Sequence, residues 1–565
     1  MNPTHEREPI VSNCENQKTV ADLVISCLEA EGVEYMFGIP GEENIRLVVG
    51  TAGSKIRFIL TRHEQAAAFM ADIYGRLTGK AGVCTATLGP GAINLALGVA
   101  DAQTDSTPLV AITAQVGLNR IYKESHQIVD VVSMYKPLTK WADTLLTPAS
   151  APEMVRKAFD VAQSERPGAA YLAIPEDVEA APAPADARPL PQRPTHSAGA
   201  DPAQVQAAAK LIRSAKRPII LAGHGAARAR AAKALTRFSE LTGIPVATTF
   251  MGKGVISDRH PNALGVVGFM RHDFENFAFD KADLIIAIGY ELQEFAPSRI
   301  NPKRDTPILH IHRFAQDTDA AYPVASSIEG EIGLALEALS QEFTASPCPA
   351  YPRDAVIRAL HAEELKAGEN DSGFPVKPQR IVNDIRKALG DEDIVLADTG
   401  AIKMWMARLY PAYAPLTCLI SNGLSTMAFA LPGALGAKLA KPKAKVLAAM
   451  GDGSFLMNSQ EIETAVREKI PLVVLVWVDG AYGLIKWKMD LEMGHHRNVD
   501  FGNPDFVQYA ESFGATGYQI KAAGDLLPTL RKALDDDGVS VIACPVDYRE
   551  NMKLTAKLGS LTDPL

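Results

Sequence analysis

Short runs of apolar residues, each followed by a turn or by an amphipathic stretch, recur along the whole chain. In the first part these runs cover residues 33–37, 56–60, 83–87, 108–114 and 171–175. Continuous apolar runs of this length are typical of strands that are buried on both faces of a parallel sheet. Before them, apolar positions at helical spacing lie between Thr19, a suitable N-cap, and Gly32, a suitable stop. The pattern therefore predicts alternating helices and strands, and hence an α/β fold.

Two further series of strand-like runs follow the first. The second covers residues 218–225, 244–250, 282–289 and 307–312, and it fades into a polar stretch at 346–373. The third covers residues 393–398, 444–453, 471–480 and 539–547. Residues 181–200 are rich in Pro and Ala and lack apolar periodicity, which is typical of a linker.

These series predict three consecutive doubly wound α/β domains with mainly parallel sheets. A chain of 565 residues is longer than one hydrophobic core usually supports, which agrees with several domains. We place the domains at residues 1–185, 186–350 and 351–565.

The composition narrows the class of protein and its partners. The net charge of −9 and the absence of a Lys/Arg block argue against a nucleic-acid partner. The start of the chain is polar, and no stretch reaches the ~20 apolar residues of a membrane span, so we expect a cytoplasmic protein without membrane association. No C-x-x-C pair occurs, so we expect buried, reduced thiols at Cys14, Cys27, Cys84, Cys348, Cys418 and Cys544.

The sharpest chemical signal lies at the ends of two successive predicted strands in the third series. Gly451-Asp452-Gly453-Ser454 follows the first of them, and Asp479-Gly480-Ala481 follows the second. Ligands of open α/β sheets bind at the carboxyl ends of strands, and carboxylates with a turn carbonyl suit Mg²⁺ bound to a diphosphate. The glycines let backbone N–H groups approach, and Ser454 is expected to open a helix whose N-terminus favours negative charge. An Asp-Gly pair also makes an ordinary turn, and the residues alone leave that alternative open.

Three other segments have either a functional or a structural interpretation. Glu64 stands at the start of a helix of small and apolar residues, where a carboxylate loses water, but a Glu there also stabilises a helix through the macrodipole. Gly89-Pro90-Gly91 is a strand-to-helix turn whose glycines permit close approach of a ligand. Met427 precedes an apolar helix, where core packing is the alternative.

The stretch from Gly451 to Asp479 resembles the cofactor motif of thiamine-diphosphate-dependent enzymes, and the segment around Glu64 is similar to the same family. The resemblance runs from about Thr19 to Leu554 and is greatest to the catabolic, FAD-independent acetolactate synthases. It includes FGIPG at 37–41, HEQAAAFMA from His63, IGYELQEFAP in the middle domain, ISNG at 420–423, VDFGNPDFVQYAESFGATG from Val499 and PVDYRENMKL from Pro545. The FAD-binding biosynthetic branch is a poorer match, so we do not expect FAD.

The resemblance implies a thiamine-diphosphate enzyme fold, with a pyrimidine-binding domain, a central domain and a C-terminal diphosphate- and Mg²⁺-binding domain. It implies that Glu64 activates the cofactor at its aminopyrimidine ring, and that Asp452, Asp479 and the carbonyl of Ala481 bind Mg²⁺. It also implies that Met427 holds the cofactor bent and that the Ser425 carbonyl accepts from its exocyclic amine. The other residues that it places at the cofactor are Pro40, Gly89, Gly91, Asn94, Gly400, Ala401, Ile402, Gly451, Gly453, Ser454, Tyr482, Gly483 and Leu484.

Two positions depart from the family pattern. Ile402 stands where relatives usually have a His, and Lys488 stands where a neutral Gln is more usual. A cation at Lys488 would hold the carboxylate of the acceptor 2-oxo acid, or would indicate a different acceptor. The alternative is that Lys486 and Lys488 are solvated loop residues. Gln127 is a candidate contact to the substrate by resemblance, whereas the neighbouring His126 is equally well explained as a surface residue.

The resemblance implies an acetolactate synthase, which decarboxylates one pyruvate on thiamine diphosphate and joins the hydroxyethyl carbanion to a second pyruvate. A 2-oxo acid decarboxylase, or a carboligase that uses an aldehyde acceptor, is the first alternative. A nucleotide-binding protein without catalysis is the second, but Gly223-His224-Gly225 lacks the third glycine of a dinucleotide motif. The family also implies a homodimer or homotetramer, in which Glu64 of one subunit faces the diphosphate-binding domain of another.

Overall fold

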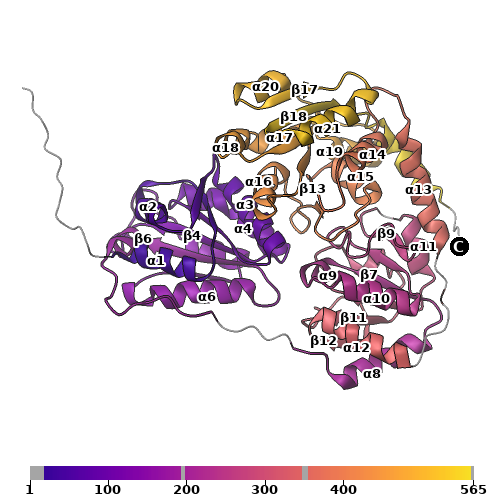
Figure 1. Cartoon of the computed structure of the whole chain (residues 1–565), viewed down its shortest axis with the longest axis horizontal. Coiled ribbons are helices and arrows are strands. Elements are labelled where there is room, and N and C mark those ends of the chain that lie inside the picture. Colours follow the sequence, from indigo (N-terminus) through magenta and orange to yellow (C-terminus); the bar gives the residue numbers. More distant parts are fainter. Residues whose placement is uncertain (1–17, 193–197, 271, 346–350, 352–353, 562–565) are drawn as a thin grey trace, which may run out of the picture.

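The computed structural model describes residues 18–192, 198–270, 272–345, 351 and 354–561, which form three six-stranded sheets (Figure 1). In all three sheets, every pair of neighbouring strands is parallel. The fold class expected from the apolar runs, three consecutive doubly wound α/β units, is therefore confirmed. The domain boundaries at 185/186 and 350/351 stay predictions.

The first sheet has the strand order β2-β1-β3-β4-β6-β5. Its strands are β1 Tyr35–Gly38, β2 Arg57–Leu60, β3 Gly82–Ala86, β4 Leu109–Gln115, β5 Trp141–Thr144 and β6 Ala169–Pro175. Its helices are α1 Val20–Ala30, α2 Ile45–Gly50, α3 Glu64–Thr78, α4 Pro90–Thr104, α5 Val131–Tyr135, α6 Ala151–Gln163 and α7 Glu176–Ala180. The predicted N-cap is confirmed, because the Thr19 hydroxyl accepts from the N–H of Asp22 at the start of α1.

The second sheet has the order β12-β11-β10-β7-β8-β9. Strands β7 to β9 follow one another toward one edge of the sheet, and strands β10 to β12 follow one another toward the other edge. Its strands are β7 Pro218–Ala222, β8 Val246–Thr248, β9 Ala263–Val266, β10 Leu284–Ile288, β11 Ile308–His312 and β12 Val324–Glu329. Its helices are α8 Pro202–Ser214, α9 His224–Arg228, α10 Ala232–Thr242, α11 Phe274–Asp280 and α12 Ile332–Ala345.

The third sheet repeats the order of the first, as β14-β13-β15-β16-β18-β17. Its strands are β13 Ile394–Ala397, β14 Cys418–Leu419, β15 Val446–Gly451, β16 Leu472–Val478, β17 Thr516–Gln519 and β18 Val539–Pro545. The helices after the second sheet are α13 Ala355–Glu369, α14 Pro378–Ala388, α15 Ala401–Leu409, α16 Ala430–Ala440, α17 Asp452–Asn458, α18 Glu461–Arg467, α19 Gly483–Met493, α20 Phe506–Ser512, α21 Leu526–Asp535 and α22 Arg549–Gly559.

The first and third sheets share one hydrophobic core, because α3 packs against α16 between them (Figure 1). Phe69 of α3 meets Phe429, which precedes α16, edge to face at 5.6 Å between ring centroids. Gly436 of α16 lies so close to α3 that a Cβ there would be 2.4 Å from the carbonyl oxygen of Met70. This packing fixes the helix that begins with Glu64 against the C-terminal part of the chain.

The elements that the sequence did not reveal are mainly edge strands. Strands β5, β9, β12, β14 and β17 lie at sheet edges, and β12 and β17 are largely exposed, so they lack a continuous apolar run. The polar stretch at 346–373 contains helix α13, which the sequence did not predict because the stretch as a whole is polar. Its Ile357 is buried in the core of the second sheet.

The predictions on cysteines and on the linker hold in the described residues. Cys27, Cys84, Cys418 and Cys544 are buried and free, and burial raises the pKa of each thiol. Cys14 and Cys348 lie outside the described residues. The parts of the linker at 181–192 and 198–200 contain a single β-bridge, between Thr19 and Pro182, and no helix or strand. In the portion of the chain that the structure describes, no helix is both long and apolar enough to cross a bilayer.

Candidate active site

Asp452 and Asp479 lie side by side at the carboxyl edge of the third sheet, because β15 and β16 are adjacent and parallel. One carboxylate oxygen of Asp452, Oδ2, accepts from the N–H of Asp479 at 3.1 Å, from the N–H of Gly480 at 2.8 Å and from Nδ2 of Asn503 at 2.7 Å. The side chain of Asp452 is thus fixed toward the end of the next strand. The expected proximity of the two strand ends is present in the structure.

The second aspartate has an environment that suits a cation. Burial and the neighbouring carboxylate of Asp452 raise the pKa of Asp479 to about 7. A divalent cation between two such carboxylates would remove their repulsion, and oxygen donors are what Mg²⁺ prefers. Space is available, since a Cβ on Gly451 would meet no atom within 4 Å. Ala481, the third predicted ligand, is buried beside them, and its carbonyl oxygen also accepts from the N–H of Gly483 at 2.9 Å.

The helix after β15 differs from the expectation. Helix α17 begins at Asp452, two residues before Ser454, so Ser454 lies inside its first turn. Its hydroxyl oxygen accepts from the N–H of Ala428 at 2.7 Å, which ties it to the segment that contains Ser425 and Met427. The contact of Ser454 with the diphosphate stays a prediction.

Residues 421–428, here called the 421–428 loop, bring Ser425 and Met427 to this edge of the sheet. Ser425 and Ala428 have φ values of +52° and +68°, which residues other than Gly rarely adopt. Asp101 of α4 accepts from the hydroxyls of Ser421 at 2.6 Å and Thr426 at 2.8 Å. The loop is therefore held in a strained conformation by the N-terminal domain of the same chain.

The glycines and neighbours predicted at the diphosphate lie around this edge. Gly400 precedes α15, which begins with the buried residues Ala401 and Ile402. Gly453 faces Tyr482 closely, since a Cβ there would lie 3.0 Å from the Tyr482 ring. Gly483 and Leu484 open α19, and a Cβ on Gly483 would lie 2.8 Å from Oδ2 of Asp479.

Glu64 is the first residue of α3 and is only 9% exposed. Its Oε2 accepts from Nδ2 of Asn94 at 3.1 Å, and Gly91 lies beside its other oxygen. Gly89 has φ +47° and packs on Gln127, because a Cβ there would lie 2.5 Å from the Gln127 carbonyl oxygen. These N-terminal site residues therefore form one cluster, with Pro40 exposed after β1.

The N-terminal cluster and the aspartate pair belong to the first and the third sheet-containing parts of the chain. Among the described residues, no hydrogen bond or ion pair links Glu64 to Asp452 or Asp479. Near Glu64, the N–H of Arg62 donates to Glu461 of α18 at 3.0 Å, which is one of several contacts between the two domains.

Lys488 lies on the outer side of α19 rather than in a loop. Its side chain is 68% exposed, and its nearest ionic neighbour is Glu492, at 3.8 Å. It borders a cleft of about 900 Å³ between α19 and the second domain, together with Leu484, Trp487, Met404 and Phe269. Lys486 differs, because it pairs with Asp500 at 2.8 Å.

Three family descriptions match the chain in order. Residues 18–134 match the N-terminal thiamine pyrophosphate binding domain of thiamine pyrophosphate enzymes, residues 205–339 match their central domain, and residues 398–544 match their C-terminal thiamine pyrophosphate binding domain. The acetolactate synthase of Bacillus subtilis (strain 168) is 34% identical over 98% of this chain and 96% of its own. The chain belongs to the thiamine pyrophosphate enzymes.

Two further relatives show the same extent of similarity. The catabolic acetolactate synthase of Raoultella terrigena is 36% identical over 95% of this chain and 97% of its own. A probable acetolactate synthase large subunit of Methanococcus aeolicus is 34% identical over 96% of this chain and 95% of its own. The similarity to acetolactate synthases that was inferred from the motifs is confirmed. Thiamine pyrophosphate is the same molecule as thiamine diphosphate.

Sequence reasoning missed several polar residues of this thiamine pyrophosphate enzyme that support the 421–428 loop. They are Asp101, Asp105, Asp398 and Lys403, all buried. Asp101 lies in the last turn of α4 among buried apolar residues, and Asp105, four residues later, is its C-cap; this spacing was the available signal. Their partners are distant in sequence, so the spacing alone could not name them.

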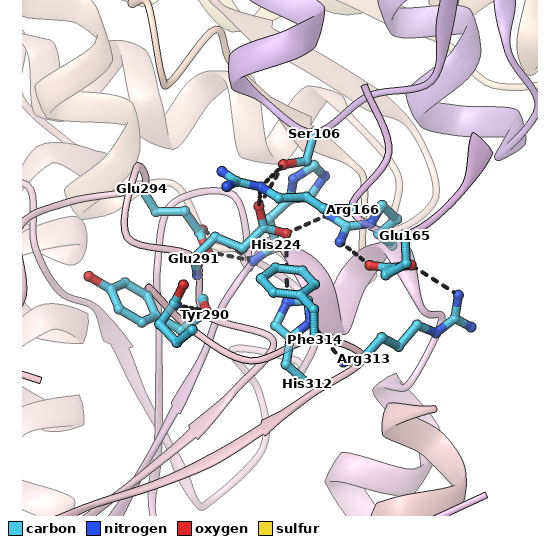
Figure 2. Close-up of polar contacts among 12 residues, drawn as sticks. Ser106, Glu165, Arg166, His224, Tyr290, Glu291, Glu294, His312, Arg313 and Phe314 are labelled. Carbon is cyan, nitrogen blue, oxygen red and sulfur yellow. Dashed lines mark hydrogen bonds and ion pairs between the residues drawn. The ribbon is translucent and has the colours of Figure 1, made fainter. Parts of the chain in front are cut away.

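The middle domain of this thiamine pyrophosphate enzyme has the strand order of dinucleotide-binding folds, but its own side chains fill the site where such folds bind ligands. Glu294 accepts from the N–H of His224 with both oxygens, at 3.1 Å, and Glu291 is fully buried beside it (Figure 2). Two carboxylates thus lie where a pyrophosphate would need donors. These residues do not fit an adenine dinucleotide such as FAD.

A second acidic group, Asp273, Glu275 and His361, brings three potential metal ligands within 4.8 Å of one another. Arg408 already pairs with both oxygens of Asp273, and His361 pairs with Glu275 at 2.5 Å. Because these charges are balanced within the protein, the group is better explained as an ionic contact between the second and third domains.

Proposed function

We propose that the protein is an acetolactate synthase that uses thiamine diphosphate and Mg²⁺ and takes pyruvate as substrate. The observation that carries the proposal is the pair Asp452 and Asp479, on neighbouring strand ends, in a chain that is similar from end to end to acetolactate synthases. The same similarity supports a carboligase rather than a protein that only binds the cofactor.

Asp452, Asp479 and the carbonyl of Ala481 would hold Mg²⁺, which in turn would anchor the diphosphate. The carbonyl of Ser425 and the side chain of Met427 would orient the aminopyrimidine and the bend of the cofactor. When bound, thiamine diphosphate supplies a carbon nucleophile and an electron sink for the loss of CO₂ from a 2-oxo acid.

Glu64 would hold and transfer the proton at the aminopyrimidine ring nitrogen. Its position supports this role, because it is nearly buried and Asn94 orients one of its oxygens. Exclusion of water and protons from the site would protect the carbon nucleophile that remains after the loss of CO₂. That carbon would then add to a second pyruvate instead of taking up a proton.

The assembly is part of the proposal. Its support is the similarity to thiamine pyrophosphate enzymes, in which the Glu-bearing domain of one subunit faces the diphosphate-binding domain of another. We therefore propose a homodimer or homotetramer, in which Glu64 of one subunit serves the Mg²⁺ site of another, and we place the protein in the cytoplasm.

Lys488 favours a second candidate function, a carboligase with another acceptor. Its ammonium borders a cleft whose wall includes Phe269, Met404 and Trp487, so a 2-oxo acid or aldehyde with a larger apolar group would fit there. Replacing Lys488 by Gln should raise KM for the acceptor 2-oxo acid if its ammonium binds the carboxylate, and should leave KM unchanged if the side chain is only solvated.

The test is to incubate the purified protein with thiamine diphosphate, Mg²⁺ and pyruvate, and to quantify CO₂, acetaldehyde and acetolactate together. Equal molar amounts of acetolactate and CO₂ support the proposal. Acetaldehyde as the main product would support a decarboxylase instead. If pyruvate is not consumed, other 2-oxo acids and aldehydes become the candidates.

A further inference from the structure

The 421–428 loop is strained and therefore needs strong local support. Two residues with side chains, Ser425 and Ala428, lie in the left-handed region, where each costs of the order of 1–2 kcal/mol. Such a conformation persists only where its surroundings impose it. The contacts that impose it identify the residues that position Ser425 and Met427.

The N-terminal domain supplies one set of contacts. Asp101 accepts from two hydroxyls of the loop, and Asp105 accepts from the N–H groups of Asn422 at 2.9 Å and Gly423 at 2.6 Å. Both aspartates are fully buried. Together they hold the loop at four residues between Ser421 and Thr426.

Lys403 of α15 supplies a second set of contacts. It is 5% exposed, and its Nζ donates to the carbonyl oxygen of Ser421 at 2.7 Å and to the hydroxyl of Ser425 at 3.0 Å. It spans the loop from one end to the strained residue itself. Its ammonium also lies 5.4 Å from the ring centroid of Phe269, a residue of the second domain.

Lys403 is also joined to the diphosphate side of the proposed site. It is the third residue of α15, directly after Ala401 and Ile402. One side chain thus connects the segment expected at the diphosphate with the loop expected at the aminopyrimidine. A buried lysine is rare unless it is paired or functional.

We propose that Lys403 is a positioning residue of the cofactor site, whose ammonium pins the 421–428 loop so that the Ser425 carbonyl and Met427 face the aminopyrimidine. The inference rests on the proposed function in one respect only, namely that these two residues meet the cofactor. It does not depend on which acceptor or product the enzyme has.

The first test compares Lys403→Met with wild type by hydrogen–deuterium exchange of residues 421–428 in the cofactor-free protein. Exchange should be at least tenfold faster in the variant, because the strained loop loses the side chain that holds both Ser421 and Ser425. Calorimetric titration of thiamine diphosphate with Mg²⁺ should then give a Kd at least tenfold higher, and Lys403→Arg should recover part of the loss.

Lys253→Met is the matched control. Lys253 is equally buried and donates to a backbone carbonyl, that of Ala407, but it does not contact the loop. Its substitution should leave loop exchange and cofactor affinity unchanged. If Lys403→Met fails to fold, Lys403→Gln keeps a shorter polar side chain that cannot span Ser421 and Ser425, and it should still accelerate exchange severalfold.

The pH dependence separates the ammonium from a merely space-filling side chain. Burial lowers the pKa of Lys403 to about 8, while the carboxylates of Asp105, Asp101 and Asp398 oppose this and Arg76 adds to it. Wild-type Kd for thiamine diphosphate should therefore rise as the pH passes 8. In Lys403→Met the Kd should stay flat over the same range.

The outcomes are distinct. Unchanged loop exchange and unchanged Kd in Lys403→Met would overturn the positioning role, even if the enzyme makes acetolactate. Wild-type protein that binds thiamine diphosphate but makes no acetolactate would refute the proposed function and leave the Lys403 comparison valid. Wild-type protein that does not bind the cofactor would overturn both proposals.

Discussion

Replacing Arg228 by Met should destabilise the contact between the N-terminal and middle domains. The guanidinium of Arg228 donates to Glu291 and to Glu165, at 2.8 Å each. Figure 2 shows Glu291 beside Ser106 and Arg166 of the N-terminal domain, from which it also accepts. Glu291 has no exposed side-chain surface. Although burial acts to raise its pKa, Arg228 and His312 hold the pKa well below its usual range.

The expected cost follows from this burial. Removing one partner of a buried ion pair leaves an uncompensated charge and typically costs about 3–5 kcal/mol. The half-exposed guanidinium of Arg166 screens Glu291 in part, so the lower end of that range is expected. We would measure urea unfolding of both proteins by circular dichroism, and follow the first transition if the domains unfold separately.

The control is Arg57→Met, which breaks a pair with Glu468 that also joins two domains but has a 49% exposed arginine. Its loss should be at most about 1 kcal/mol. The double variant Arg228→Met with Glu291→Gln should recover much of the loss, since the fully buried carboxylate becomes a neutral amide and Glu165 keeps its pair with Arg313. Because the folded-state pKa of Glu291 is depressed, the difference from wild type should be largest above the unfolded pKa and shrink as the pH falls. A cost below 1 kcal/mol, or no recovery in the double variant, would refute the reasoning.

Three further predictions address the site and a second ionic contact. Glu64→Gln should lower the rate of acetolactate formation at least a hundredfold while the Kd for thiamine diphosphate stays within severalfold; wild-type rates would contradict its role. Asp452→Asn should raise the Mg²⁺ concentration needed for half-maximal cofactor binding at least tenfold, measured by titration, and unchanged Mg²⁺ dependence would exclude it as a ligand. Burial acts to lower the pKa of His361, but the carboxylate of Glu275 raises that pKa overall. The stabilisation of the folded protein by the His361–Glu275 pair is therefore complete below the unfolded pKa of about 6.5, and it is lost as the pH rises through the folded pKa. His361→Phe should therefore destabilise the protein more at pH 6 than at pH 9 in urea unfolding, and an equal effect at both would count against this pairing.

The sequence by itself determined most of the architecture. The interior strands of all three sheets are mainly apolar because they are covered on both faces, so their composition reveals them. The ends of β15 and β16 could also be predicted, because Asp452 and Asp479 follow apolar runs directly. Neighbouring parallel strands then bring these two ends together. Edge strands such as β12 and β17 have one open side and a mixed composition, and they were visible only in the fold.

Only the tertiary structure decided which polar residues act together. Asp101 and Asp105 reach loop residues more than 300 positions away, and Lys403 reaches the same loop from α15. In the same way, the folded middle domain places Glu291 and Glu294 where its strand order would otherwise leave a ligand site. The physical reason is that the burial of apolar residues can be predicted from their local periodicity, whereas the partner of a buried charge depends on which distant segments the packed sheets bring into contact.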